Sequence, residues 1–171
     1  MEEALDDGFR GLMARFPKAG RVAWIGLRPR YRAPVEAVQT AEVVSGFGLT
    51  GDHRAIRGGG QRQVTLIQAE HLAAVAAMLG RDAIDPALLR RNIVVAGINL
   101  LTLQDREFHI GEAVLLGTGP CAPCSRMEEA LGRGGLNAMR GHGGITARVV
   151  TSGTIHVGDS VRPAQARQPD A

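Results

Sequence analysis

The chain has 171 residues, with 20 Lys or Arg, 17 Asp or Glu and a formal net charge of +3. This length suits a single domain that buries a core without the help of disulfides. There is no apolar run of about 18 residues, and the acidic N-terminus lacks the basic and apolar regions of a secretory leader, so we expect no membrane association. The two cysteines are too few for a disulfide framework, and the expected setting is the cytoplasm, with reduced thiols.

The positive charge lies outside the first eight residues, which hold four acids and no base. Nearly all of it is Arg, since Lys18 is the only lysine. Arg suits the planar, bidentate binding of phosphate. The sequence has no basic stripe interleaved with aromatic residues, as single-strand binders use. We therefore expect a small phosphorylated ligand rather than specific nucleic-acid binding.

The two ends of the chain differ from its middle. Apolar residues at helical spacing predict a helix over residues 2–16, which Pro17 ends. Its apolar stripe predicts docking on the body of the domain or on a second copy of the chain, as in a homodimer. Residues 1–20 are thus interpreted as an N-terminal amphipathic helix, residues 21–163 as the main domain, and the Gln-, Pro- and Ala-rich residues 164–171 as a disordered tail.

The main domain reads as many short strands with a few helices between them. Strand patterns cover residues 21–27, 35–44, 63–67, 93–95, 107–110, 113–116, 145–150, 154–157 and 160–162. Helical patterns cover residues 68–79, 86–90 (after an Asp85-Pro86 start) and 125–131, and residues 132–144 form a Gly-rich stretch. Seven to nine strands without regular strand–helix alternation favour a largely antiparallel barrel or sandwich with inserted helices.

Two polar segments are candidates for binding an anion. The Gly-rich loop over residues 45–54 ends in Asp52, His53 and Arg54, although neither common phosphate-loop pattern is present. Arg90, Arg91 and Asn92 stand where a helix meets a strand. In both segments a solvated surface turn is the alternative interpretation.

The most informative stretch is residues 117–132, which holds both cysteines as Cys121-Ala-Pro-Cys124. Ser125 and Glu128 have the spacing of a capping box, which predicts Ser125 as the N-cap of a short helix. Cys124 would then lie at the positive end of that helix, near Arg126, where a thiolate is favoured over a thiol.

Three interpretations of the cysteines remain open: structural filler in the core, a thiolate that binds a metal or cofactor, and a redox pair. A zinc site would need two more ligands, and the five His show no His-x₃₋₅-His pair. A thioredoxin-like pair would need a βαβ context, which the pattern lacks.

Taken together, these segments resemble the MOSC domain, the family named for the C-terminal domain of molybdenum cofactor sulfurase. The resemblance covers residues 22–163 and is carried by segments that follow in the family's order: residues 48–54, 62–67, 89–95 with 97–100, Pro123-Cys124, and 153–159. It implies a mainly β fold (α+β), a mixed or antiparallel β-barrel with peripheral helices.

The resemblance also implies a site. Cys124 would be the functional cysteine, either as a ligand of molybdenum or as the carrier of a persulfide. Arg90 and Asn92 would hold the phosphate and the polar edge of the pterin. The remaining residues expected around this pocket are Asp52, His53, Arg54 and Arg62.

The function implied is that of a small oxidoreductase that uses the molybdenum cofactor (molybdopterin) on N-hydroxylated small molecules. A separate electron-donating reductase is expected, because the sequence shows no flavin, haem or iron–sulfur motif. The alternative is a sulfur carrier that performs no reduction, in which Cys121 would be a resolving thiol for a persulfide on Cys124. Pyridoxal phosphate is not expected, because the aminotransferase-like sulfurase domain is absent.

Overall fold

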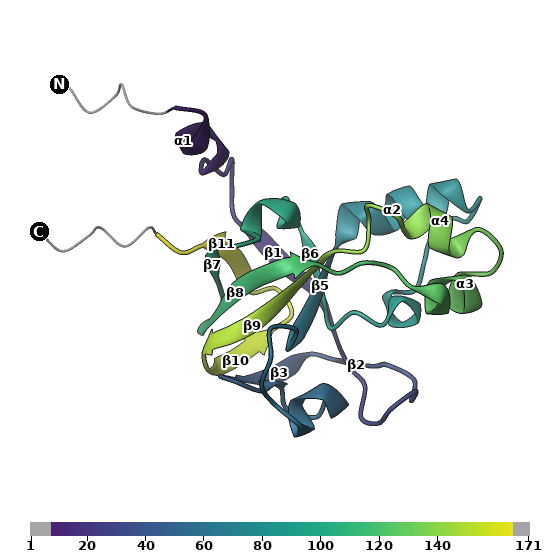
Figure 1. Ribbon diagram of the computed structural model, residues 1–171, viewed down its shortest axis with the longest axis horizontal. Coiled ribbons are helices and arrows are strands. Elements are labelled where there is room, and N and C mark those ends of the chain that lie inside the picture. The colour runs from purple at the N-terminus through teal and green to yellow at the C-terminus, as the bar shows by residue number, and fades with distance from the viewer. Residues whose placement is uncertain (1–7, 166–171) are drawn as a thin grey trace, which may run out of the picture.

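The computed structural model describes residues 8–165, and its centre is a closed barrel of seven strands (Figure 1). Around the barrel the order is β11-β7-β8-β9-β5-β6-β1, and β1 pairs with β11 to close it. Only the β5–β6 pair is parallel, so the predicted mixed barrel with peripheral helices is confirmed. The barrel strands are β1 (Gly20–Leu27), β5 (Val64–Gln68), β6 (Ile93–Ala96), β7 (Glu107–Ile110), β8 (Ala113–Pro120), β9 (Ile145–Thr151) and β11 (Ser160–Pro163).

Four further short strands are described, so that residues 8–165 contain eleven strands rather than the predicted seven to nine. They are β2 (Glu36–Val38), β3 (Thr40–Val44), β4 (Gly48–Leu49) and β10 (Gly153–His156). The single strand predicted over residues 35–44 is two strands, because β2 pairs with β1 whereas β3 pairs with β10 in a separate small sheet.

The core is aliphatic and has two parts, one on each side of the parallel pair of strands. Leu66 and Ile93 face the barrel interior, whereas Ile67 and Val94 face the helices that cover the outside. Strands buried on both faces read as continuous apolar runs, which explains the sequences of β5 and β6. The covering helices are α2 (Ala69–Met78), α3 (Ser125–Leu131) and α4 (Gly135–Met139), and they gather at one end of the molecule (Figure 1).

Three 3₁₀ turns connect these elements: η1 (His53–Ile56), η2 (Pro86–Leu89) and η3 (Leu100–Leu103). The predicted start of η2 is confirmed, because Asp85 Oδ1 accepts a hydrogen bond from the Ala87 amide at 2.9 Å. The Gly-rich stretch after α3 contains α4, which the sequence did not indicate.

The N-terminal helix α1 (Phe9–Met13) projects away from the barrel (Figure 1). The side chains of Phe9, Leu12 and Met13 are 77%, 53% and 52% exposed, so the predicted packing on the body of the domain is not seen for them. Phe16, just beyond the helix, does pack against the barrel core. The remaining parts of the predicted helix and tail, residues 1–7 and 166–171, lie outside the described residues. No helix within residues 8–165 has the length and apolar character needed to cross a membrane.

Candidate functional site

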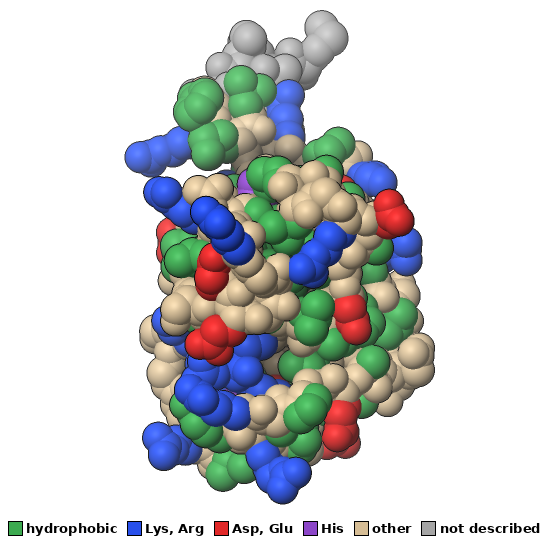
Figure 2. Space-filling view, turned by 90° about the vertical axis from the view of Figure 1, so that its right-hand side faces the viewer, with side chains coloured by type: hydrophobic (Ala, Val, Ile, Leu, Met, Phe, Trp, Pro, Cys, Tyr) green, Lys and Arg blue, Asp and Glu red, His purple; other side chains and the backbone are tan. Residues whose placement is uncertain are grey.

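A cavity of about 440 Å³ lies between η1, the loop that follows β1, the junction of η2 with β6, and the loop that leads into α3. Six of the residues that line it are arginines, and none of the described residues around it is acidic. The basic side chains gather around a hollow in the lower half of the face shown in Figure 2. The lining residues are Arg28, Tyr31, His53, Arg54, Arg62, Thr65, Arg90, Arg91, Cys121, Ala122, Pro123, Cys124, Arg126 and Met127.

The two cysteines lie on the wall of this cavity, but their surroundings differ. The Cys121 amide donates to the Gly144 carbonyl at 2.8 Å, which extends the β8–β9 ladder and leaves this side chain only 6% exposed. Cys124 is exposed, and both thiols are free. The cavity wall therefore presents one accessible sulfur and one that is nearly enclosed.

The start of α3 differs from the prediction by one residue. Cys124, with φ −129° and ψ 178°, is itself the N-cap, and no side chain caps the helix. The predicted capping box from Ser125 is wrong, because the Glu128 carboxylate instead accepts from the amides of Gly134 and Leu136 at 2.8 and 2.9 Å. The hydrogen bonds from Leu136 and Gly134 also hold the pKa of Glu128 below its ordinary value. Cys124 is thus closer to the positive end of α3 than the sequence indicated.

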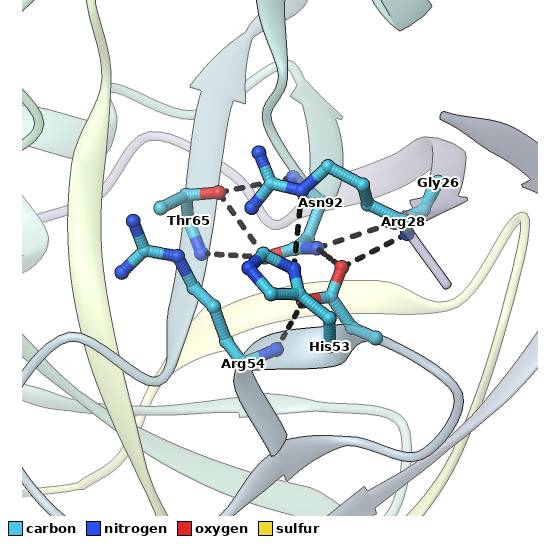
Figure 3. A network of polar contacts seen from close by, with 7 residues as sticks. Gly26, Arg28, His53, Arg54, Thr65 and Asn92 are labelled. Atoms are coloured by element: carbon cyan, nitrogen blue, oxygen red, sulfur yellow. Dashed lines mark hydrogen bonds and ion pairs between the residues drawn. The ribbon is translucent and has the colours of Figure 1, made fainter. Parts of the chain in front are cut away.

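Asn92 lies behind the cavity in a buried network that joins three strands (Figure 3). Its Oδ1 accepts from the amide and the hydroxyl of Thr65, both at 3.1 Å. Its Nδ2 donates to the Gly26 carbonyl at 3.3 Å and to Asp52 Oδ2 at 3.0 Å. An amide side chain can donate two hydrogen bonds and accept two, so this network uses all of its capacity.

Asp52 extends the same network to η1. Besides Asn92, its carboxylate accepts from the amides of Arg28 and Arg54, at 3.0 and 3.1 Å. The side chain is 3% exposed and does not line the cavity. Asp52 therefore anchors the start of η1, so that His53 and Arg54 face the cavity.

His53 is held in one tautomer by its arginine neighbour (Figure 3). Arg28 Nε donates to His53 Nδ1 at 3.3 Å, so that nitrogen does not also donate to Asp52 Oδ1, which lies 3.8 Å away. Burial and the Arg28 charge lower the pKa of His53 below its ordinary value, although the Asp52 carboxylate acts in the opposite direction. The ring is therefore neutral, with Nε2 as its hydrogen-bond donor.

The adjacent arginines of the η2–β6 junction have different surroundings. The Arg91 guanidinium is buried and donates to the carbonyls of Gly143, Leu89 and Cys121, at 2.9, 3.0 and 3.1 Å, so it fixes the cysteine loop. Arg90 has a left-handed backbone, with φ 60°, and its side chain lines the cavity. Burial and the charge of Arg126 lower the pKa of Arg90, although the Cys124 sulfur partly offsets this by raising it.

Tyr31 stands at the rim of the cavity between two further arginines. Arg126 Nη2 donates to the Tyr31 hydroxyl at 3.0 Å, and the guanidinium carbons of Arg126 and Arg32 lie 5.4 and 5.6 Å from the ring centroid. Hydrogen bonds from Arg32 and Arg126 lower the pKa of Tyr31. The ring thus holds two guanidiniums in place by cation–π contacts as well as by hydrogen bonding.

The structure divides the residues predicted from the sequence into two sets. Those that line the cavity are Cys121, Cys124, Arg90, His53, Arg54 and Arg62, and those that lie behind it are Asp52 and Asn92. Sequence analysis did not include Arg28, Tyr31, Thr65 or Arg126 in the site. Three arginines within five residues, at positions 28–32, were the available signal for that loop.

The chain belongs to the MOSC domain family, whose model matches residues 53–162, more than half of the chain. Solved structures with the same fold include the YuaD protein from Bacillus subtilis, at 19% identity and a TM-score of 0.72, over 88% of this chain and 100% of that one. YiiM from Geobacillus stearothermophilus aligns at 16% identity and a TM-score of 0.69, over 85% of this chain and 75% of that one. YiiM from Escherichia coli aligns at 18% identity and a TM-score of 0.64, over 88% and 72%. No curated protein matches the sequence.

Proposed function

We propose that this chain binds the molybdenum cofactor in the Cys124 cavity and acts as a small oxidoreductase on N-hydroxylated compounds. The observation that carries the proposal is one exposed thiol that shares a cavity with six arginines and no acidic residue among those described. Thiolate sulfur is a soft ligand of the kind that suits such a metal. Guanidinium groups suit the phosphate of a pterin.

The electrostatics of the cavity favour an anionic ligand. Burial and neighbouring guanidiniums lower the pKa values of Arg28 and Arg90, so these charges are desolvated and repel one another. An anion placed among them would relieve this repulsion. The residues present therefore fit a ligand that carries a phosphate at one end.

Each group of the chain would have a separate task. Cys124 would ligate the metal, Arg90, Arg126 and Arg54 would bind the phosphate, and neutral His53 would offer Nε2–H as a donor. The cofactor, when bound, would supply the two-electron redox chemistry. Reduction of an N-hydroxyl group takes up two electrons and two protons and releases water, so the proposal includes a separate reductase as electron donor.

The test is to express the chain with a supply of cofactor and to measure molybdenum and the fluorescence of the oxidised pterin in the purified protein. We expect both in the wild type, and loss of most of the molybdenum in Cys124→Ser. Cys121→Ser is the matched control, since it removes the enclosed thiol and should retain the metal. Wild-type protein with neither molybdenum nor pterin would refute the proposal.

The position of Cys121 supports a second candidate, a sulfur carrier without reductase activity, because both thiols line one cavity. In this scheme the Cys121 thiol attacks the inner sulfur of a Cys124 persulfide, which forms a disulfide and releases hydrogen sulfide. A mass increase of one sulfur atom on Cys124 would support this scheme. Undiminished reduction of hydroxylamines by Cys124→Ala would argue against both candidates. Residues 8–165 contain no group of three or more His, Cys, Asp or Glu placed to hold a metal ion, as a zinc site would need.

A further inference from the structure

A second hollow, of about 380 Å³, adjoins the Cys124 cavity, and the function proposed above leaves it without a role. The two hollows share Arg90 and Arg126, which therefore stand at the boundary between them. Both volumes fall in the range of small-molecule sites. A ligand that passes between these arginines would occupy both hollows.

The walls of the second hollow differ from those of the first. Apolar side chains predominate, including Pro34, Val35 and Leu88, and Leu88 is 40% exposed despite its size. Glu129 supplies a carboxylate, a group that does not occur among the described residues of the Cys124 cavity. Apolar walls with a few convergent polar groups are typical of sites that bind the organic part of a ligand.

The arginines at the boundary are oriented by contacts on the rim. The Tyr31 hydroxyl accepts from Arg126 at 3.0 Å, and the ring also holds Arg32, whose guanidinium carbon lies 5.6 Å from the centroid. Arg32 lines only the second hollow. Three guanidiniums are thus placed along one line of passage, which suits two linked phosphates better than one.

We propose that the two hollows form one site for a nucleoside diphosphate group. The pyrophosphate lies between Arg90 and Arg126, and the nucleoside packs against Leu88 while Glu129 accepts hydrogen bonds from its hydroxyl or amino groups. The inference builds on the proposed function, because the far end of the pyrophosphate would continue into the cofactor in the Cys124 cavity. The bound cofactor would then carry a nucleotide on its phosphate.

Calorimetric titration of the purified protein with phosphate, pyrophosphate, ADP, GDP and CDP at low salt tests this inference. At least one of the three nucleotides should bind about tenfold more tightly than pyrophosphate, the ratio that corresponds to about 1.4 kcal/mol. Glu129→Gln and Leu88→Ser should weaken binding of that nucleotide and leave pyrophosphate binding unchanged.

Two variants serve as matched controls. Glu112 lies in the β7–β8 turn, at the other end of β8 from the cavity, and Leu101 is 47% exposed on η3. Glu112→Gln and Leu101→Ser should bind the nucleotide and pyrophosphate as the wild type does. If no nucleotide binds more tightly than pyrophosphate, or if the Glu129 and Leu88 variants weaken both ligands equally, the inference is overturned.

The outcome can be separated from that of the proposed function. A preference for nucleotides in protein that never acquires molybdenum would refute the cofactor proposal and support the nucleoside site. Molybdenum-loaded protein whose extracted pterin carries a single phosphate, with no preference for nucleotides, would refute the nucleoside site alone.

Discussion

Arg90 and Asn92 are two residues apart, yet they belong to different layers of the same site. Asn92 makes four hydrogen bonds inside the domain, to Thr65, Gly26 and Asp52. Arg90 faces a cavity where its described neighbours are cations and a thiol. The inner layer, Asp52, Thr65, Arg91 and Asn92, satisfies its polar groups within the protein, whereas the outer layer of arginines depends on a ligand for its counter-charge.

The comparison shows that stability and ligand binding are assigned to different side chains at this site. A change in the inner layer leaves buried polar groups without partners, which is costly. A change in the outer layer removes a charge that the folded protein itself does not neutralise. The two layers should therefore be separable by mutation, and the following predictions test that separation from the largest effect to the smallest.

Asn92→Asp should give the largest effect, because it places a carboxylate opposite Asp52 Oδ2 and the Gly26 carbonyl, both of which now accept from Asn92 Nδ2. We expect a loss of about 3 kcal/mol in the free energy of unfolding, measured with urea. Asn99→Asp is the control, since Asn99 is an exposed N-cap where Asp serves equally well. Equal stability of the two variants would contradict a structural role for Asn92.

Gly143→Ala should reach both layers at once. A Cβ atom at Gly143 would collide with the Cys121 carbonyl and lie 3.2 Å from Arg91 Nη2, so the cysteine loop would have to move. We expect a loss of about 2 kcal/mol in unfolding free energy, together with weaker binding of pyrophosphate. Gly8→Ala, where a Cβ would meet nothing within 4 Å, should change neither quantity.

Arg90→Gln should affect binding and leave stability nearly unchanged. A charge-assisted hydrogen bond to a phosphate is lost, so the affinity for pyrophosphate should fall about tenfold in calorimetry. The free energy of unfolding should stay within about 0.5 kcal/mol of the wild type, since a repelling charge is removed along with any packing. Arg162→Gln, on exposed β11, should change neither quantity. A large loss of stability in Arg90→Gln would place Arg90 in the inner layer.

The smallest effect concerns pH and uses a histidine outside both layers. His71 on α2 packs edge-to-face on His142, with ring centroids 4.9 Å apart, and its buried Nδ1 has no hydrogen-bond partner. Burial and the His142 ring lower the pKa of His71, although Glu70 acts in the opposite direction. The folded protein therefore binds fewer protons than the unfolded chain, and the stability from this group is complete above about pH 6.5 and is lost as pH falls below it.

His71→Gln should flatten the rise in stability between acidic and neutral pH, measured as urea midpoints at several pH values. His53 also has a lowered pKa and contributes with the same sign, so a residual slope should remain and should come from the site. An unchanged slope in His71→Gln would show that the helical side of the molecule does not contribute to it.

Much of the barrel could be predicted because its strands carry local signals. The hairpin of β7 and β8 around Gly111 and the start of η2 at Asp85 follow from turn and cap chemistry, and both are found in the structure. The convergence of Arg90 and Cys124 on one cavity was indicated only through the resemblance, since nothing local to either segment sets their distance. The direction of each side chain along residues 90–92 depends on the left-handed turn at Arg90, which the sequence does not mark.

The features that were missed depend on contacts between distant segments. Glu128 could cap its own helix or the amides of Gly134 and Leu136, and only the tertiary packing of α3 on α4 decides between them. Tyr31 and Arg28 lie in a loop that reads locally as a turn, and they reach the cavity because β1 ends beside η1, where the His53 amide donates to the Arg28 carbonyl. Local patterns thus predicted the frame, and the rim of the site required the fold.

The left-handed backbone of Arg90 has a consequence for protein engineering. A non-glycine residue at φ 60° carries a conformational penalty of about 1 kcal/mol, which glycine would relieve. A selection for heat resistance alone should therefore enrich Arg90→Gly, because the substitution removes both the backbone strain and a desolvated cation. Thermostabilised libraries of this barrel should keep position 90 fixed, or they will converge on robust proteins that have lost their grip on the ligand.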